Sequence, residues 1–152
     1  MSSFPELNIP AGVFKIVQHE RGYDIWDDFR KKYVLLTPEE WVRQHILWYL
    51  VNYLQYPQGR ISVESSIKMN GLQRRCDAIV FDELLHPLVL IECKSYDVEI
   101  SQETLMQIST YNRTLQVKYW LLTNGMKTYF LLRKNNPDEF IFQHELPLYH
   151  TL

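Results

Sequence analysis

Cysteine is scarce in this sequence, and the two that occur are not spaced as metal ligands. Cys76 and Cys93 are the only cysteines among the 152 residues. Both lie inside strand-like runs, where a cysteine usually behaves as a small buried hydrophobic residue. Two thiols cannot complete a zinc site alone, and no histidine lies at ligand spacing from either of them. The pattern therefore excludes a zinc site built on cysteine.

Glycine and proline are also few, with five and seven residues, while 46% of the chain is hydrophobic and 22% is charged. This composition argues against disordered, collagen-like and low-complexity chains. None of the glycines begins a GxGxxG or GxxxxGK[ST] pattern, which excludes a dinucleotide-binding domain and an ATPase motor within these residues. No GxSxG elbow occurs either.

Long apolar runs and a strong net charge are absent as well. No apolar stretch approaches the roughly 20 residues that a membrane helix needs. The first ten residues lack the basic and apolar regions of a signal peptide. A net charge of −2 excludes a purely electrostatic nucleic-acid binder. We therefore expect a soluble, cytoplasmic protein with no membrane contact.

The pattern of apolar and turn-forming residues predicts one α/β domain spanning 1–152. Thr37-Pro38-Glu39-Glu40 predicts a helix start, with Thr37 as N-cap and Glu40 completing a capping box, and the helix should run to about Tyr56. Ser101 should cap a second helix over 102–115. Alternating apolar residues and turns predict strands over 13–17, 23–26, 33–36, 61–69, 74–82, 88–96, 118–124, 127–133 and 139–144.

Three charged residues on two of these strands form a candidate site. If Asp82 pairs with Pro87, Asp77 lies directly opposite Glu92, with β-carbons roughly 5 Å apart on one face. Lys94 shares this face because strand side chains alternate. The opposite face should be a core face made of Cys76, Ala78, Val80, Val89, Ile91 and Cys93.

Two opposed carboxylates repel each other unless a positive charge lies between them. Mg²⁺ suits this position, since it takes one or two carboxylates together with waters and substrate phosphates. Lys94 could then orient a water or help to deprotonate it. The alternative is structural: Asp77 marks a strand entry, and Glu92 and Lys94 form a salt bridge at a strand end.

Four segments carry a family resemblance: PEEWVRQ at 38–44, CDAIVFD at 76–82, VLIECK at 89–94 and QISTY at 107–111. In this order they resemble the motifs of the PD-(D/E)XK nuclease superfamily, and more closely those of the N-terminal nuclease domain of type I restriction enzyme R subunits. The resemblance implies a restriction-endonuclease-like core of order αβββαβ, with a central mixed sheet flanked by helices. The core would span about 37–133, and the strands within 13–36 and at 139–144 would be additions.

The resemblance also implies roles for individual residues. Asp77, Glu92 and the backbone carbonyl of Cys93 match the ligands of a Mg²⁺ ion, for which Mn²⁺ can substitute. Lys94 matches the lysine that serves the attacking water. Cys76 stands where the family has proline, which leaves the matching aspartate in place.

Three helix residues complete the predicted catalytic set. Glu40 would reach the metal through water or a second ion, although a purely structural capping role is equally open, and Glu39 should face solvent. Gln107 and Tyr111 match a QxxxY motif of related nucleases, so they would steady the site or touch the DNA backbone. An ordinary polar helix edge is the alternative for this pair.

We therefore expect a Mg²⁺-dependent DNA endonuclease with a role in restriction-modification. The alternative is a catalytically idle nuclease-like domain that binds DNA or a partner protein. Partners left open are a motor or specificity protein acting in trans and a second copy of the chain. The charged runs Asp27-Asp28 and Arg30-Lys31-Lys32 are typical of a solvated loop. The basic residues proposed for phosphate contact are Arg60, Lys68, Arg74, Arg75, Arg113 and Lys118.

Overall fold

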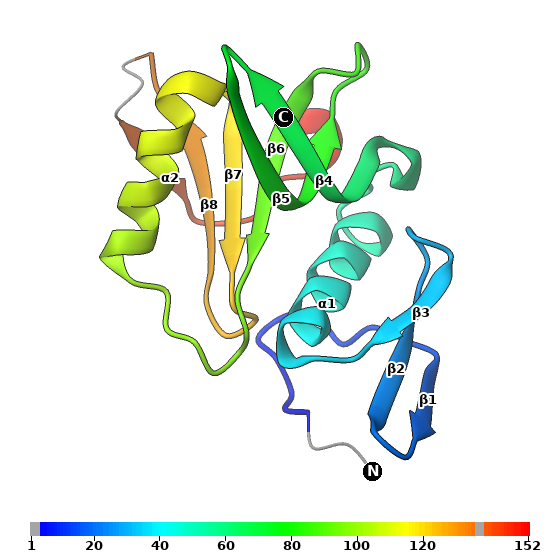
Figure 1. The fold of residues 1–152 in the computed structure, drawn as a ribbon. Coiled ribbons are helices and arrows are strands. Elements are labelled where there is room, and N and C mark those ends of the chain that lie inside the picture. Colours follow the sequence, from blue (N-terminus) through cyan, green and yellow to red (C-terminus); the bar gives the residue numbers. More distant parts are fainter. Residues whose placement is uncertain (1–3, 136–138) are drawn as a thin grey trace.

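The chain folds into two β-sheets and two α-helices, a mixed α/β arrangement that confirms the predicted class (Figure 1). The computed structural model describes residues 4–135 and 139–152, apart from the side chain of Met69. Neither helix in this described part is long and apolar enough to cross a membrane. The first sheet is antiparallel and consists of β1 (Ile16–His19), β2 (Gly22–Asp27) and β3 (Lys32–Leu35).

The second sheet has six strands in the order β4-β5-β6-β7-β8-β9. Only its β6–β7 pair is parallel, and a parallel pair requires a crossover connection, here provided by helix α2 (Gln102–Leu115). Helix α1 (Pro38–Asn52) precedes the sheet, and the short 3-10 helices are η1 (Gln58–Arg60) and η2 (Tyr149–Thr151). The strands are β4 (Ile61–Met69), β5 (Leu72–Phe81), β6 (Pro87–Cys93), β7 (Tyr119–Thr123), β8 (Thr128–Arg133) and β9 (Phe140–Gln143).

Helix α1 begins at the predicted place, but its capping box is only half formed. The Thr37 hydroxyl accepts a hydrogen bond from the Glu40 N–H at 3.1 Å. In a complete box the Glu40 side chain would accept from the Thr37 N–H in return. That N–H donates instead to the Leu35 carbonyl at 3.1 Å. The Glu40 carboxylate is therefore available for other partners.

The same helix ends at Asn52 rather than near Tyr56. Gln55 adopts a left-handed backbone conformation with φ of 62°. The Tyr56 N–H then turns back to donate to the Leu50 carbonyl at 3.0 Å. A left-handed residue followed by such a returning bond is a common way for a helix to close.

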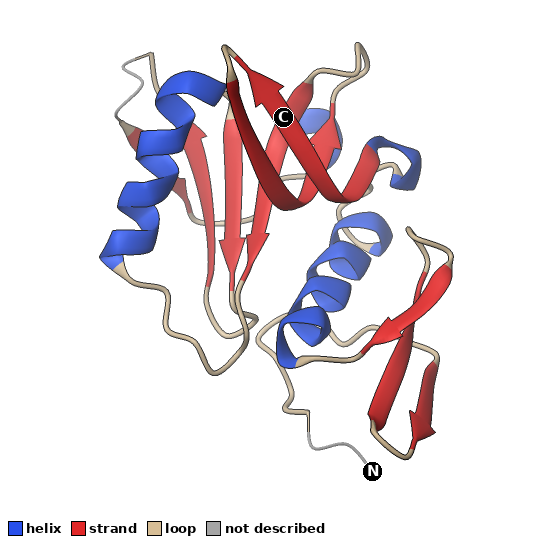
Figure 2. Cartoon of the chain, viewed as in Figure 1, coloured by secondary structure: helices blue, strands red, loops and turns tan. Residues whose placement is uncertain are grey.

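Each helix covers one face of the six-stranded sheet, and each interface has its own apolar core (Figure 2). We call these the α1 core and the α2 core. The alternation of β7 separates them, because Leu121 belongs to the α1 core while Trp120 and Leu122 belong to the α2 core. The sheet is thus covered on both faces, as the predicted core requires.

The β5–β6 ladder has the predicted register in its body but not at its turn. Ala78 pairs with Ile91, and Val80 pairs with Val89. A bulge then follows, and Phe81 rather than Asp82 pairs with Pro87. The predicted closing pair is wrong because Asp82 caps the turn: its carboxylate accepts the N–H groups of Leu84 at 2.8 Å and His86 at 2.9 Å.

One residue of the predicted core face, Cys76, lies on the other side. Ala78, Val80, Val89, Ile91 and Cys93 belong to the α1 core, whereas Cys76 packs in the α2 core. The alternation breaks beside Glu64 of β4, which the ladder leaves unpaired and which has φ of 52°. This irregularity faces Asp77, at the position where the polar site is built.

Candidate functional site

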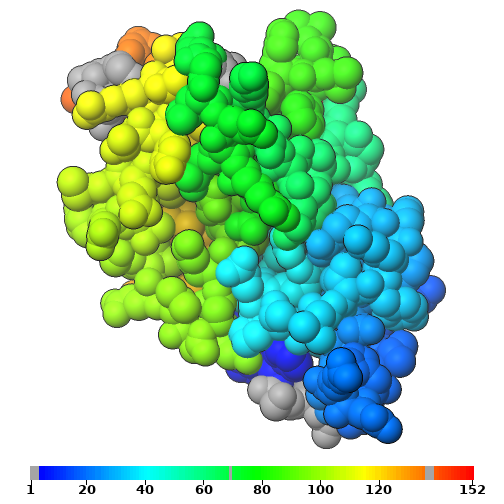
Figure 3. All heavy atoms as spheres, viewed as in Figure 1, coloured from blue at the N-terminus to red at the C-terminus, as the bar shows by residue number. Residues whose placement is uncertain are grey.

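Asp77 lies where α1, β5 and β6 meet. The β4–β5 pair, in green, and α2, in yellow, lie side by side on the face of the molecule drawn in Figure 3. Oδ2 of Asp77 accepts a hydrogen bond from the Cys93 N–H at 2.7 Å. Its Oδ1 lies 3.6 Å from Nη1 of Arg43 on α1. The β5–β6 register places Glu92 opposite it, one step beyond the last paired residues, Ala78 and Ile91. The predicted juxtaposition of the two carboxylates is therefore compatible with the observed ladder.

Glu92 is the more buried of the two carboxylates and has its own arginine. Its Oε1 accepts a hydrogen bond from Nη2 of Arg74 at 3.0 Å. Burial, together with the charge of Asp77, raises the pKa of Glu92 to about 7, although Arg74 and Lys94 oppose the rise. A carboxyl group with this pKa needs a positive partner to remain ionised. The charge of Asp77 therefore lies within electrostatic reach of Glu92.

The guanidinium of Arg74 connects this site to α2. Its central carbon lies 4.1 Å from the ring centroid of Tyr111 and 5.8 Å from that of Trp120. Tyr111 therefore supports Arg74, and through it Glu92. Gln107 and Lys94 line a small cavity of about 30 Å³ together with Arg74, Glu92, Thr104, Ile108 and Leu122.

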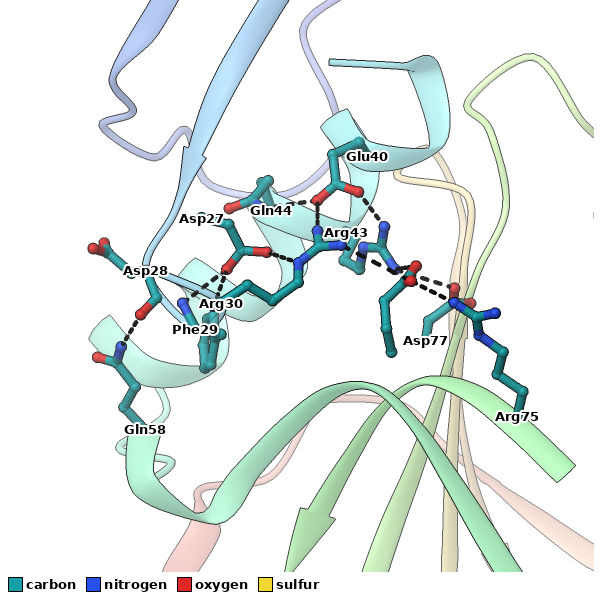
Figure 4. Close-up of polar contacts among 11 residues, drawn as sticks. Asp27, Asp28, Phe29, Arg30, Glu40, Arg43, Gln44, Gln58, Arg75 and Asp77 are labelled. Carbon is teal, nitrogen blue, oxygen red and sulfur yellow. Dashed lines mark hydrogen bonds and ion pairs between the residues drawn. The ribbon is translucent and has the colours of Figure 1, made fainter. Parts of the chain in front are cut away.

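Glu40 occupies a different environment from the one proposed for a metal ligand (Figure 4). It is 4% exposed. Its Oε1 accepts hydrogen bonds from Arg30 Nη2 at 2.7 Å and Gln44 Nε2 at 2.8 Å, and its Oε2 accepts from Arg43. Both oxygens are thus engaged by side chains, and its contact with a metal stays a prediction.

Glu39 is exposed, as predicted, but it is electrostatically coupled to the site. Partial burial and the charge of Asp77 raise the pKa of Glu39, while Arg43 and Lys94 lower it. Glu39 is therefore the first-helix carboxylate whose own charge is perturbed by Asp77. Glu39 and Glu40 are neighbours in the sequence, and their environments differ because their side chains leave α1 in different directions.

A chain of ion pairs runs from the first sheet to Asp77. We call Asp27, Arg30, Glu40, Arg43, Glu64, Arg75 and Asp77 the charge network (Figure 4). Arg43 is central, since it contacts Glu40, Glu64 and Asp77. Arg43 was not among the residues predicted for the site, although it lies three residues after Glu40 and therefore on the same side of α1.

The prediction that the charged runs around Asp27 form a solvated loop is wrong for Asp27 itself, which belongs to the charge network. Asp27 is fully buried, and its carboxylate binds the Arg30 side chain and accepts the N–H groups of Phe29 at 2.8 Å and Arg30 at 3.0 Å. Strand alternation could have indicated this, because Ile25 is also buried and shares the inward face of β2 with Asp27. Asp28 and Lys31 do remain exposed.

The oxygen donors at the site suit a hard divalent cation. Among residues 4–135 and 139–152, no group of three or more His, Cys, Asp or Glu is arranged to hold a metal ion. Mg²⁺ does not need such a group, because it often binds one or two carboxylates and keeps several waters. Glu92 is partly buried, has a raised pKa and already accepts a hydrogen bond from a cation, Arg74. Asp77, Glu92 and the Cys93 carbonyl therefore fit Mg²⁺ chemically.

The raised pKa of Glu92 predicts a pH-dependent stability of the metal-free protein. The pKa of Glu92 is raised from its ordinary value of 4.5 to about 7, so the folded state binds this proton more tightly than the unfolded state does. The contribution of Glu92 is thus fully present below its unfolded pKa and is lost as pH rises through its folded pKa. The free energy of unfolding of the wild type, relative to Glu92→Gln, should fall between pH 5 and pH 8. Urea denaturation in EDTA checks this, and a pH-independent difference would contradict it.

Comparison with known proteins gives one family. Residues 38–147 match the family model described as type I restriction enzyme R protein N terminus. No curated protein is similar enough to the chain to match it. The matched stretch contains every predicted site residue and most of the charge network.

Proposed function

Since the chain belongs to the family of type I restriction enzyme R protein N-terminal domains, a PD-(D/E)XK-type nuclease family, we propose that it is a Mg²⁺-dependent DNA endonuclease. The element order α1-β4-β5-β6-α2-β7 supports a restriction-endonuclease-like core. The observation that carries the proposal is the placement of Asp77 on β5 beside β6, where its carboxylate accepts the Cys93 N–H, with Glu92 of β6 and Lys94 just after it bordering one small cavity. Carboxylates and a lysine in such a group are suited to metal-assisted phosphodiester hydrolysis.

Asp77, Glu92 and the Cys93 carbonyl would hold the Mg²⁺, or Mn²⁺ in its place. When bound, such an ion lowers the pKa of a coordinated water and stabilises the charge that develops on the phosphate. The chain fixes the donors beforehand. The Cys93 N–H orients Asp77, and β6 continues into Lys94, whose backbone N–H donates to the Thr123 carbonyl of β7 at 2.8 Å.

Lys94 would position the attacking water or take part in its deprotonation. Lys94 lies two residues after Glu92 and lines the same small cavity, so both side chains face the same space. Gln107 lines this cavity from α2 and is proposed to touch the DNA backbone. Tyr111 would act through Arg74, whose guanidinium it supports. Glu40 is proposed to act by holding Arg43 beside Asp77.

The proposed partners follow from the family. DNA would be the substrate, and the other subunits of a restriction complex, a motor protein among them, would act in trans. A homodimer stays a prediction. The alternative function, an idle domain that binds DNA or a partner protein, differs in one measurable respect, because it would bind without cutting.

Cleavage assays with a lysine variant test the proposal. Plasmid and single-stranded DNA are incubated with the wild type, Lys94→Met and Lys127→Met in Mg²⁺ or Mn²⁺. Lys94→Met should lower the rate about 10²-fold, the range expected for loss of a group that assists proton transfer. Lys127 is exposed in the β7–β8 turn and serves as the matched control.

Two outcomes would argue against this assignment. Equal rates for Lys94→Met and the wild type would remove Lys94 from the catalytic group. A folded wild type that binds DNA and Mg²⁺ but leaves both substrates intact, with or without partner subunits, would favour the idle binding domain.

A further inference from the structure

We propose that Arg74 is a movable counter-ion, which pairs with Glu92 while no cation is bound and contacts a DNA phosphate once a cation has taken Glu92. This inference rests on the proposed function, since it requires both DNA and a metal ion at the site. In this arrangement Arg74 couples metal binding to DNA binding.

The contacts of Arg74 fit a group with two alternative partners. One terminal nitrogen of Arg74 donates to Glu92 at 3.0 Å. The Arg74 side chain is 20% exposed, so part of it reaches the protein surface. Its Nε is buried and has no hydrogen-bond partner within the described residues. A guanidinium carries five N–H donors, and the single Glu92 contact leaves most of them for another acceptor.

Electrostatics gives the direction of the exchange. Arg74 is attracted to Glu92 only while no other cation balances the negative charge of that carboxylate. A divalent cation on Glu92 would cancel that attraction and repel the guanidinium, because like charges a few ångströms apart interact strongly where water is partly excluded. A phosphate is the natural alternative partner, since its oxygens match the planar fork of arginine.

Tyr111 allows the guanidinium to move without losing its support. The ring lies 4.1 Å from the central carbon of Arg74, and a cation–π contact depends on the ring and not on Glu92. Lys94 and Gln107 border the same cavity and would also face an incoming phosphate. Arg43 cannot serve in this way, because it is 7% exposed and held by Glu40, Glu64 and Asp77.

The test is a double-mutant cycle of DNA binding to the full chain. A fluorescent duplex is titrated with protein in EDTA or in Ca²⁺, with a gel to check that it stays intact. We expect Ca²⁺ to tighten binding by the wild type about tenfold, the value of one charged hydrogen bond. Glu92→Gln, which releases Arg74 without a metal, should show a similar gain in EDTA. Both gains should vanish in Arg74→Gln and in the double variant.

Arg75→Gln is the matched control, because Arg75 is the next residue of β5, is 72% exposed and, within the described part of the chain, pairs with Glu64 alone. This variant should keep the gain with Ca²⁺. If Arg74→Gln fails to fold, Tyr111→Phe should keep the gain and Tyr111→Leu should lose it. A gain that persists in Arg74→Gln or Tyr111→Leu would overturn the role of Arg74 while leaving the nuclease proposal intact. A wild type that binds no DNA under either condition would overturn both.

Discussion

Replacing Asp77 with Asn should lower metal-dependent DNA cleavage by about 10²- to 10³-fold while leaving the protein folded. Asn keeps an oxygen that can accept the Cys93 N–H, which Asp77 now accepts at 2.7 Å. It removes the negative charge that would hold the cation and that acts on Glu92. The fold should survive because Arg43 retains Glu40 and Glu64 as partners.

Initial cleavage rates, thermal melting and calorimetric Mg²⁺ titration of Asp77→Asn provide the measurement. Asp82→Asn is the matched control, since Asp82 directly follows the same strand but caps the β5–β6 turn through Leu84 and His86. Its effect should be on stability, not on Mg²⁺ affinity. Cleavage by Asp77→Asn within about tenfold of the wild type, well short of the loss expected for such a group, would remove Asp77 from the metal site.

Replacing Arg43 with Met should destabilise the protein by about 3–5 kcal/mol, because it removes one partner from buried ion pairs. Glu40 would keep Arg30 and Gln44, and Glu64 would keep Arg75. Asp77 would lose the arginine that lies beside it. The methylene stem of Met fills part of the volume, so most of the loss would come from uncompensated charge.

Urea denaturation of Arg43→Met, with Arg75→Met as control, measures this effect. Arg75 belongs to the same charge network but is largely exposed, so its replacement should cost no more than about 1 kcal/mol. Adding Glu40→Gln to Arg43→Met should recover part of the loss, since Glu40 would have lost one of the two arginines that balance its charge. Equal stability of Arg43→Met and the wild type would show that the buried pairs contribute nothing net.

Local sequence patterns were sufficient for most of the secondary structure. Strand β4 and helix α2 have the predicted limits, because Asn70-Gly71 and Ser101 carry their own turn and capping chemistry. Strand β1 is Ile16–His19 rather than 13–17, since its pairing is set by the hairpin with β2 and not by its apolar residues. The β5–β6 register was predicted from an assumed closing pair of Asp82 with Pro87, and the body of the ladder has that register although this pair is not formed.

The charge network could not be predicted in the same way. Arg30 and Glu40 are ten residues apart on a loop and a helix, and Arg43 and Glu64 are twenty-one apart on a helix and a strand. Such pairs depend on how elements pack, which periodicity does not describe. The left-handed Glu64 inside a strand and the half-formed capping box of Glu40 are departures from local rules, and both belong to this network.

The segment that matches the family model does not contain all the residues that its fold depends on. Arg30 and Asp27 precede it, and so does Pro5, whose carbonyl accepts the Trp41 indole N–H at 3.0 Å. Leu7 and Ile9 fill part of the α1 core. A fragment trimmed to the shared motifs would leave Glu40 without Arg30 and one side of α1 uncovered. Residues 4–37 therefore cover one side of the site, so that the segment matching the family and the segment that folds as a unit have different boundaries.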